Sequence, residues 1–349
     1  MARSQMTSME RVMAVCNHER PDRVPFIIAS RAFGLKYAGA KFSQAYQDPD
    51  LYIGSQLKLI KDFGLDSAWD IWCTPAVDEA LGATMDTPED DPPWIAEPCV
   101  HGPDDLNKLR RIDPWKDGRM PYMLDLVARL KKAVGPDMPV TAWASPPFRT
   151  ACMIRGNTEL YMDIFDNPGF VKDLLEITTE SCTAYGKALV EAGADIIAIS
   201  NPVANTDCIS LEHFKEFAHP YSKRMFGDMK AAGAKAINFH TCGRWDDRFD
   251  LCCENVDIIH CDRVDIGQFT ARYSDRIVAM GNVKAVATML QGSEEQVQRE
   301  ALACLETAGS SNRYILSADC EVPRDTNPAN MRALASALAQ YNSRTHVQA

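Results

Sequence analysis

The chain lacks long hydrophobic runs and lacks an excess of positive charge. An apolar stretch of roughly 18 residues, the length of a membrane-spanning helix, is absent from the 349 residues. Lys and Arg number 37 against 48 Asp and Glu, so the net charge of −11 disfavours nucleic acid and anionic membranes as partners. The N-terminus also lacks the apolar core of a signal peptide. We therefore expect a cytoplasmic protein.

Internal repeats and low-complexity segments are absent as well, and eight short, apolar, β-rich runs stand out instead. They span residues 24–28, 65–72, 139–144, 195–200, 236–240, 256–260, 276–281 and 313–318. Helical patterns separate most of them, as at residues 167–189, 211–232 and 293–308, and Asn327-Pro328 begins a last helix. This alternation predicts parallel strands joined by helices, and eight units favour a single closed (β/α)8 TIM barrel over an open sheet.

The barrel is expected to form one domain over residues 1–349. Residues 1–20 are expected to form a helical extension before the barrel. Residues 74–118 are irregular, with several prolines among many acidic residues. We interpret this stretch as an insertion after the second strand that lies near the barrel mouth, and a plain surface loop is the alternative.

Three residues at the ends of two predicted strands have the chemistry of a metal site. His240 ends the fifth run, Cys242 follows two residues later, and Cys320 follows the eighth run. Residues i and i+2 of a strand face the same side, and barrel active sites lie at the C-terminal strand ends. One imidazole and two thiolates suit zinc, and three protein ligands leave a fourth position open for catalysis.

Most of the twelve cysteines are expected to be reduced, buried hydrophobic side chains. The competing His and Cys residues are Cys208, His213, His219, Cys252-Cys253 and His260-Cys261. Neighbouring strand residues point to opposite sides, so His260 and Cys261 cannot easily share one metal. Buried packing is the better interpretation for the two adjacent pairs, and Cys208 remains a reserve ligand.

Further residues near predicted strand ends are candidates for contact with a substrate. They are Arg31, Trp69, Trp72, Trp143, Phe148, Arg149, Asn201, Asn205 and Asp262. The aromatic residues would form an apolar pocket or simply pack. The asparagines would hydrogen-bond a substrate or form turns. Asp262 would support a zinc ligand, orient a substrate or pair with Arg244 or Arg263. The arginines would bind an anionic group or form surface salt bridges.

Several motifs resemble the uroporphyrinogen decarboxylase superfamily, a family of (β/α)8 barrels, over nearly the whole chain. They are Glu10-Arg11-Val12, the run from Asn17 to Pro25, Glu79-Ala80-Leu81-Gly82, Gly281-Asn282-Val283 and the run from Asn327 to Met331. One branch of this superfamily decarboxylates uroporphyrinogen without a metal. The other comprises zinc-dependent methyltransferases that work with corrinoids, such as the methylcobalamin:coenzyme M enzymes. In that branch a His-x-Cys pair and a distant Cys bind zinc, which implies this role for His240, Cys242 and Cys320.

The resemblance to the decarboxylase branch is weaker. That branch opens with an arginine-rich segment that grips the carboxylates of the porphyrinogen, whereas residues 30–34 here contain one arginine, Arg31. It also has a histidine near the position of Cys320. Asp70-Ile71 does resemble its aspartate segment after the second strand. The decarboxylase therefore stays as the alternative, and a non-catalytic barrel subunit is a third possibility.

The resemblance implies a zinc-dependent methyltransferase that moves a methyl group between a small substrate and a corrinoid protein. The substrate would be a methoxylated aromatic or another methyl donor, as in O-demethylation, or a thiol acceptor such as coenzyme M. A corrinoid signature of the form Asp-x-His-x-x-Gly is absent, so the cobalamin would arrive on a partner protein. Nothing in the chain selects between a monomer and a homodimer.

Overall fold

The computed structural model describes residues 5–71 and 75–346 and divides the chain into two compact units. Unit 1 comprises Met1–Ile71, Arg129–Thr141 and Asp257–Ala349, and unit 2 comprises Trp72–Ala128 and Ala142–Val256. Helix α6 (Met120–Val134) and strand β4 (Val140–Trp143) each cross from one unit into the other. The expectation of one domain stays a prediction.

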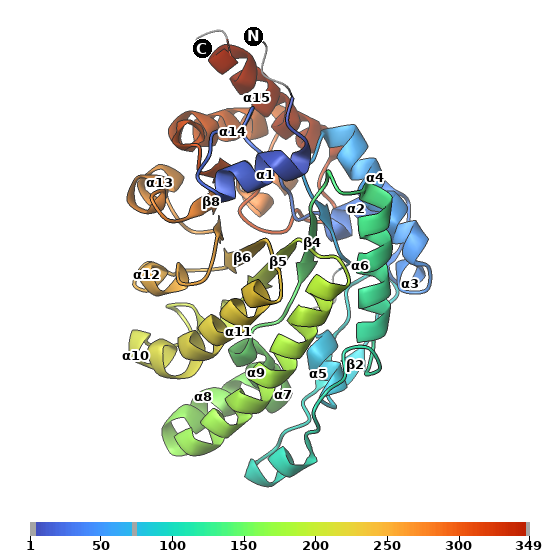
Figure 1. Ribbon diagram of the computed structural model, residues 1–349, viewed down its shortest axis with the longest axis vertical. Helices are drawn as coiled ribbons and strands as arrows, with labels where there is room; N and C mark the ends of the chain where they lie inside the picture. The colour runs from blue at the N-terminus through green and yellow to red at the C-terminus, as the bar shows by residue number, and fades with distance from the viewer. Residues whose placement is uncertain (1–4, 72–74, 347–349) are drawn as a thin grey trace. The chain divides into compact units, whose positions relative to one another are not determined.

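Unit 1 contains the first and last elements of the chain. Its helices are α1 (Ser8–Cys16), α2 (Arg31–Tyr37), α3 (Phe42–Ala45), α4 (Pro49–Phe63), α13 (Ile266–Tyr273), the π-helix η4 (Ala285–Leu290), α14 (Glu294–Ala308), the 3-10 helix η5 (Gly309–Ser311) and α15 (Pro328–His346). Its strands are β1 (Ala68–Trp69), β7 (Ile258–Cys261), β8 (Val278–Met280) and β9 (Tyr314–Ile315). In Figure 1 α14 and α15 lie side by side near both labelled chain ends.

Unit 2 contains the middle of the chain. Its helices are α5 (Ala76–Ala80), the 3-10 helices η1 (Pro103–Lys108) and η2 (Pro202–Ala204), α7 (Pro147–Arg155), α8 (Asn157–Asp166), α9 (Pro168–Glu191), α10 (Leu211–His213), the π-helix η3 (Phe214–Ala218), α11 (His219–Ala231) and α12 (Phe249–Cys252). Its strands are β2 (Thr84–Asp86), β3 (Trp94–Glu97), β5 (Ile196–Ser200) and β6 (Ala236–Thr241). Helices α7 and α8 both pack against the long helix α9 (Figure 1).

The seven-stranded sheet has the order β1-β4-β5-β6-β7-β8-β9, which follows the chain. The pairs β1–β4, β5–β6, β7–β8 and β8–β9 are all parallel. All residues of these strands are buried except His240 in β6, as expected for strands that helices cover. Parallel neighbours in sequence order are the arrangement that strand–helix alternation predicts.

Residues 25–27 close this sheet within unit 1. The N–H of Ile27 donates to the carbonyl of Leu316 at 3.1 Å, and the N–H of Leu316 donates to the carbonyl of Pro25 at 2.9 Å. On the other side, the N–H of Asp66 donates to the carbonyl of Phe26 at 2.7 Å. This segment therefore joins the end of β9 to the residues that lead into β1, the two edges of the sheet. The predicted (β/α)8 barrel is confirmed.

Seven of the eight predicted strand runs contain a strand, and the first does not. Residues 24–28 form only an isolated parallel bridge, between Phe26 and Leu316. Pro25 has no N–H to donate, and the N–H of Phe26 donates to the carboxylate of Asp66 at 2.8 Å instead of to a strand. The prediction of a regular first strand is therefore wrong, although the segment occupies the expected place in the ring.

Helix boundaries follow local capping chemistry. Ser293 and Gln296 form a capping box at the start of α14, and Thr7 and Glu10 form one at α1. Helix α4 begins with a proline in its first turn and ends at Gly64, which has a φ of +70°. The single helix expected over residues 211–232 is instead divided into α10, the π-helix η3 and α11. Sequence periodicity does not separate these hydrogen-bond patterns.

The irregular stretch at residues 74–118 has secondary structure of its own. Strands β2 and β3 form a two-stranded antiparallel sheet, and η1 follows them. All three lie in unit 2, and most of their residues are exposed or half-buried. The placement of this insertion near the barrel mouth stays a prediction.

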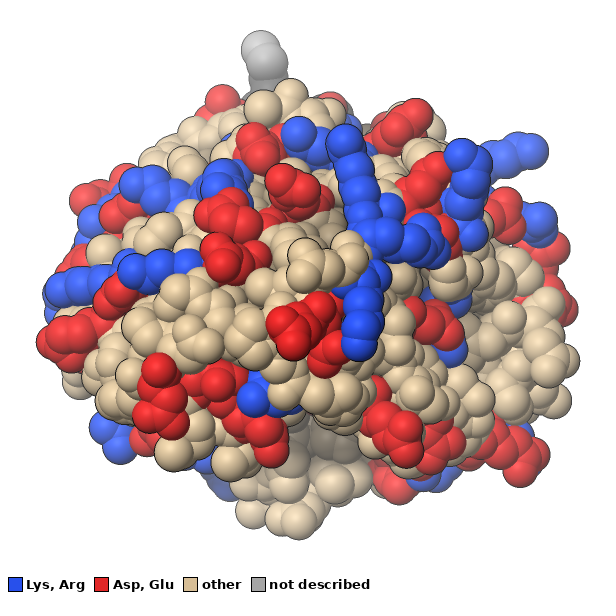
Figure 2. Space-filling view, turned by 90° about the horizontal axis from the view of Figure 1, so that it is seen from below, with Lys and Arg blue, Asp and Glu red and all other residues tan. Residues whose placement is uncertain are grey.

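Acidic and basic side chains are interspersed rather than segregated on the face that Figure 2 shows. Many surface charges pair locally, as do Lys58 with Asp62 and Lys116 with Asp113, each at 2.7 Å. Exposed pairs of this kind add little stability. Within the described residues, no helix is both long enough and apolar enough to cross a membrane.

A buried carboxylate holds the closure of the sheet together. Asp66 is 1 % exposed and accepts hydrogen bonds from Ser8 on α1 and from the guanidinium groups of Arg11 and Arg23. It also accepts the N–H of Phe26. One side chain thus binds α1, residues 23–26 and the start of β1 to one another. Because the carboxylate is removed from water, its stability contribution depends on all of these partners.

The substitution Asp66→Asn is expected to lower the free energy of unfolding by about 3 kcal/mol, because two arginines then lose a buried anionic partner. Chemical denaturation of the variant and the wild type measures this difference. Asp62→Asn is the control, since Asp62 also accepts from a cation and a hydroxyl but lies on the surface of α4. Equal stabilities of the two variants would contradict the role given to Asp66.

Candidate metal centre

The end of β6 positions His240 and Cys242. The residues from Ala236 to Phe239 are buried, whereas His240 and Cys242 are half-buried. Parallel pairing with β5 places His240 opposite Ser200, the last residue of that strand. Cys242 lies one residue beyond the strand. The imidazole and the thiol therefore emerge where the regular hydrogen bonding of β6 ends.

Three neighbours fix the turn at Cys242. Its carbonyl accepts the indole N–H of Trp245 at 2.9 Å and the side-chain amide of Asn205 at 3.3 Å. Gly243 has a φ of +89°, and a Cβ there would lie 2.4 Å from Nδ2 of Asn205. Glycine is therefore required both by the backbone conformation and by the close approach of Asn205. Trp245 is fully buried, with edge-on ring contacts to Phe214 and Phe239.

Cys320 lies in a bend after β9 and is held through its neighbours in the chain. Ala318 bridges to Val283, and its carbonyl lies 2.8 Å from Nε2 of His260. The N–H of Asp319 donates to the carbonyl of Val283 at 2.8 Å. On the other side, the N–H of Val322 donates to the carbonyl of Ala29 at 2.8 Å. Hydrogen bonds thus fix the backbone on both sides of the half-buried Cys320.

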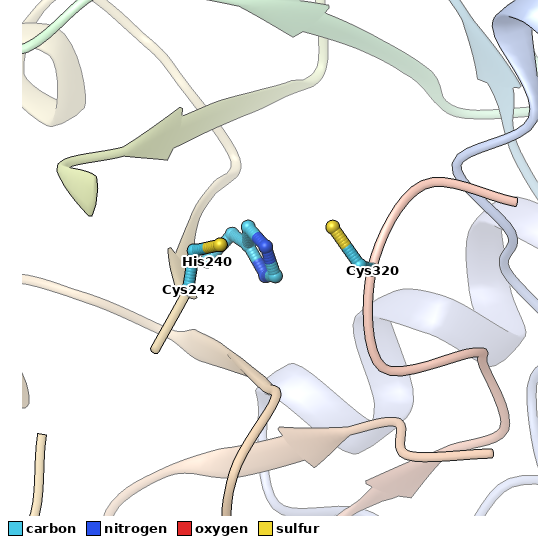
Figure 3. A group of neighbouring side chains, drawn as sticks. All are labelled: His240, Cys242 and Cys320. Atoms are coloured by element: carbon cyan, nitrogen blue, oxygen red, sulfur yellow. The ribbon is translucent and has the colours of Figure 1, made fainter. Parts of the chain in front are cut away.

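His240, Cys242 and Cys320 form a group whose candidate ligand atoms all lie within 4.8 Å of one another. Figure 3 shows the two thiol sulfurs on either side of the imidazole, with the sulfur of Cys320 directed toward the ring. Among the described residues, no other group of three or more His, Cys, Asp or Glu has this geometry. One nitrogen and two sulfur donors fit zinc, and three protein donors leave one tetrahedral position for a substrate.

The competing residues lie elsewhere. His260, Cys261 and Cys252 are buried, which confirms the expectation of packing for these three, whereas Cys253 is half-buried. The exposed Cys208 donates to the carbonyl of Pro202 at 3.6 Å. Among the residues that the structure describes, none of these belongs to the group of three candidate ligands.

The structure places the aromatic substrate candidates deep in the fold. Trp69, Trp143 and Phe148 are 3 %, 9 % and 0 % exposed. Packing is the role that these exposures favour, while contact with a substrate stays a prediction. Trp72 lies outside the described residues.

Among the polar candidates, Asn201 has the clearest reason to meet a substrate. It directly follows β5, is 1 % exposed, and its Oδ1 has no hydrogen-bond partner. An unsatisfied buried acceptor is costly, so it marks a position for a missing donor. Asn205 instead supports Cys242, a role that the sequence does not reveal because the two residues are 37 positions apart. The half-buried Asp262 accepts hydrogen bonds through its backbone carbonyl from Asn282 and Lys284.

Both arginine candidates form ion pairs, as the alternative interpretation expects, but the pairs are largely buried instead of lying at the surface. Arg31 is buried and pairs with Glu321 at 2.9 Å. Arg149 lies 3.3 Å from Asp78 and donates to Ser145 at 2.9 Å. Burial raises the pKa of Asp78 to about 6, and the nearby Arg149 opposes this rise. Substrate binding by Arg31 stays a prediction.

Comparison with known proteins identifies the family to which the chain is similar. The family model described as uroporphyrinogen decarboxylase (URO-D) matches residues 7–341. A methylcobamide:CoM methyltransferase, MtaA, of Methanosarcina barkeri is 26 % identical over 97 % of this chain and 99 % of its own. A uroporphyrinogen decarboxylase of Chlorobaculum tepidum is 25 % identical over 85 % of this chain and 86 % of its own.

A solved structure of a methyltransferase from Methanosarcina mazei superimposes with a TM-score of 0.87 at 22 % identity, covering 96 % of this chain and 99 % of that one. At this identity the likeness demonstrates a shared fold. Since the family model extends over nearly all of the barrel, the chain belongs to the uroporphyrinogen decarboxylase (URO-D) family.

Proposed function

We propose that this protein is a zinc-dependent methyltransferase that moves a methyl group between a small substrate and a corrinoid protein. The observation that carries the proposal is the convergence of His240, Cys242 and Cys320 on one point. Relatives that match 97 % of the chain are named as methylcobamide:CoM methyltransferases, and another is named as a methylated-thiol–coenzyme M methyltransferase. Both names describe methyl transfer that involves coenzyme M.

The three candidate ligands would bind the ion in two different charge states. Cys242 and Cys320 would bind as thiolates, whose two negative charges offset the charge of a divalent cation, and His240 would bind as a neutral imidazole. When bound, zinc supplies a Lewis acid that holds a substrate thiol as thiolate, or polarises the oxygen of a methyl ether, without a redox change. The fixed turns at residues 242–243 and 318–322 would hold the two sulfurs in place around the ion.

Asn201 is the substrate-binding residue that the structure supports best. Its neighbour Ser200 pairs with His240 across β5 and β6, so Asn201 lies at the same level of the sheet as the metal ligands. Its unsatisfied Oδ1 would accept a hydrogen bond from a hydroxyl or amine group of the substrate.

A methoxylated aromatic, another methyl donor and a thiol such as coenzyme M are the substrate classes proposed. The corrinoid would come from a partner protein, and a cytoplasmic location belongs to the same proposal.

Uroporphyrinogen decarboxylase is the second candidate, because relatives with that name match 85 % of the chain or more. A porphyrinogen with several carboxylates requires available cations. Arg31, the one arginine of the segment at residues 30–34, is bonded to Glu321 and lies 3.8 Å from Asp70. Its charge is thus already balanced inside the protein, which weighs against this candidate. A non-catalytic barrel would require a fourth protein ligand on the metal.

Purified wild-type protein is expected to contain about one zinc per chain, and Cys320→Ala is expected to lose most of it, because only two protein ligands remain. Elemental analysis by mass spectrometry gives the metal content, and circular dichroism checks the fold. Cys208→Ser is the matched control, since this thiol is exposed and outside the ligand group. A folded wild-type protein without bound metal would eliminate the zinc proposal.

Methyl transfer can be followed in the absorption spectrum of cobalamin. Wild-type protein with methylcobalamin and a thiol, or with reduced cobalamin and a methoxylated aromatic, is expected to change the spectrum as the methyl group leaves or joins cobalt. The variant Cys242→Ala should slow this change by roughly 100-fold or more, because the Lewis acid contributes several kcal/mol. Turnover of uroporphyrinogen without any methyl exchange would favour the decarboxylase instead.

A further inference from the structure

The strongest unexplained feature near the candidate site is the carboxylate of Glu321, the residue after Cys320. It accepts hydrogen bonds from the backbone N–H groups of Arg31 and Ala32, at 2.6 and 3.3 Å. It also accepts from Nε and Nη2 of the Arg31 guanidinium, at 3.1 and 2.9 Å. Four donors on one carboxylate, from residues 290 and 289 positions away in the chain, amount to a specific tertiary anchor.

The opposite end of this anchor is equally constrained. The Arg31 side chain is 3 % exposed, lies 3.8 Å from the carboxylate of Asp70, and stacks over the ring of Trp69 at 5.3 Å. Trp69 ends β1, and the backbone of Asp70 is tied to Tyr52 and Thr141. The guanidinium therefore connects Glu321 to the rigid end of a barrel strand. A fork of fixed donors on the half-buried carboxylate of Glu321 defines its position more tightly than a single charge would.

Cys320 needs such an anchor, because no strand holds it. It lies in a bend beyond the bridge at Ala318, outside the strands of the sheet. On the preceding side, the carboxylate of Asp319 accepts the N–H of Ala285 at 2.8 Å and lies 3.3 Å from the ammonium of Lys284. Glu321 supplies the corresponding anchor on the following side. Both chain neighbours of the thiol are thus carboxylates that bind other elements of unit 1.

We propose that Glu321, through its fork with Arg31, is a positioning residue that aims the thiolate of Cys320 at the metal. The inference rests on the proposed zinc function. It adds the residue pair that sets the position of Cys320, the ligand that is far in the chain from the other two. It also gives Arg31 a role that requires no contact with substrate. Partners that orient metal ligands from outside the coordination sphere typically change metal affinity by roughly 10-fold to 100-fold when removed.

The test is Glu321→Gln, which keeps the shape of the side chain but replaces one acceptor oxygen with a donor that opposes the guanidinium. Zinc affinity, measured by competition with a chromophoric chelator, is expected to fall by roughly 10-fold or more. With cobalt(II) in place of zinc, the thiolate-to-metal charge-transfer absorption is expected to weaken toward that of one bound thiolate. This signature reports on the number of bound thiolates, whereas a general loss of stability would leave the spectrum of the folded fraction unchanged.

Glu79→Gln is the matched control. Glu79 accepts the backbone N–H, Nε and Nη2 of Arg119 at 3.2, 2.8 and 3.0 Å, which is nearly the same arrangement, but it adjoins no metal ligand. Its variant should bind zinc and cobalt like the wild type. If Glu321→Gln also binds like the wild type, or if both variants weaken binding equally, the positioning role is overturned. A wild-type protein that binds no zinc would instead refute the proposed function.

Arg31→Lys decides the question if Glu321→Gln does not fold. Lysine keeps the buried positive charge and the backbone donors but cannot form the fork. A folded Arg31→Lys protein is expected to show about tenfold weaker zinc binding and the same change in the cobalt spectrum. Unaltered zinc binding and an unaltered spectrum in this variant would overturn the proposal.

Discussion

The buried carboxylate of Asp66 is the interaction on which the closure of the barrel depends. It joins Ser8, Arg11, Arg23 and the N–H of Phe26, and so brings α1 and residues 23–26 against the start of β1. Phe26 in turn bridges to Leu316 beside β9. The same segment continues to Ala29, which accepts the N–H of Val322. These contacts of Asp66 therefore fix the edge of the sheet that precedes Cys320, and they do so without a metal ion.

Cys242 and Cys320 both lie just past the regular hydrogen bonding of a strand, and each is held by side chains that the strand does not supply. At Cys242 the anchors are local, namely the indole of Trp245 and the amide of Asn205. At Cys320 the anchors are carboxylates of the neighbouring residues, bonded to distant parts of unit 1. Rigid elements with short anchored turns are the usual way in which barrels hold reactive groups at strand ends.

Much of the fold follows from sequence patterns. Seven of the eight apolar runs contain strands. Helix α14 begins where Ser293 and Gln296 form a capping box. Residues 24–28 do not form a strand, because Pro25 cannot donate and Asp66 captures the N–H of Phe26. The helix at residues 211–232 contains a π-helical turn that apolar periodicity does not distinguish. At residues 24–28 a specific hydrogen bond, rather than hydrophobicity, decides the local structure.

The sequence by itself determined the ligand types of the candidate site, their order, and their places at the ends of predicted strands, because residue chemistry and strand period are local properties. Only the tertiary structure decided how those ligands are supported. The fork between Arg31 and Glu321 joins residues 290 positions apart, and Asn205 reaches Cys242 across 37. Contacts of this range depend on which strands become neighbours in the closed sheet, and no local pattern encodes that choice.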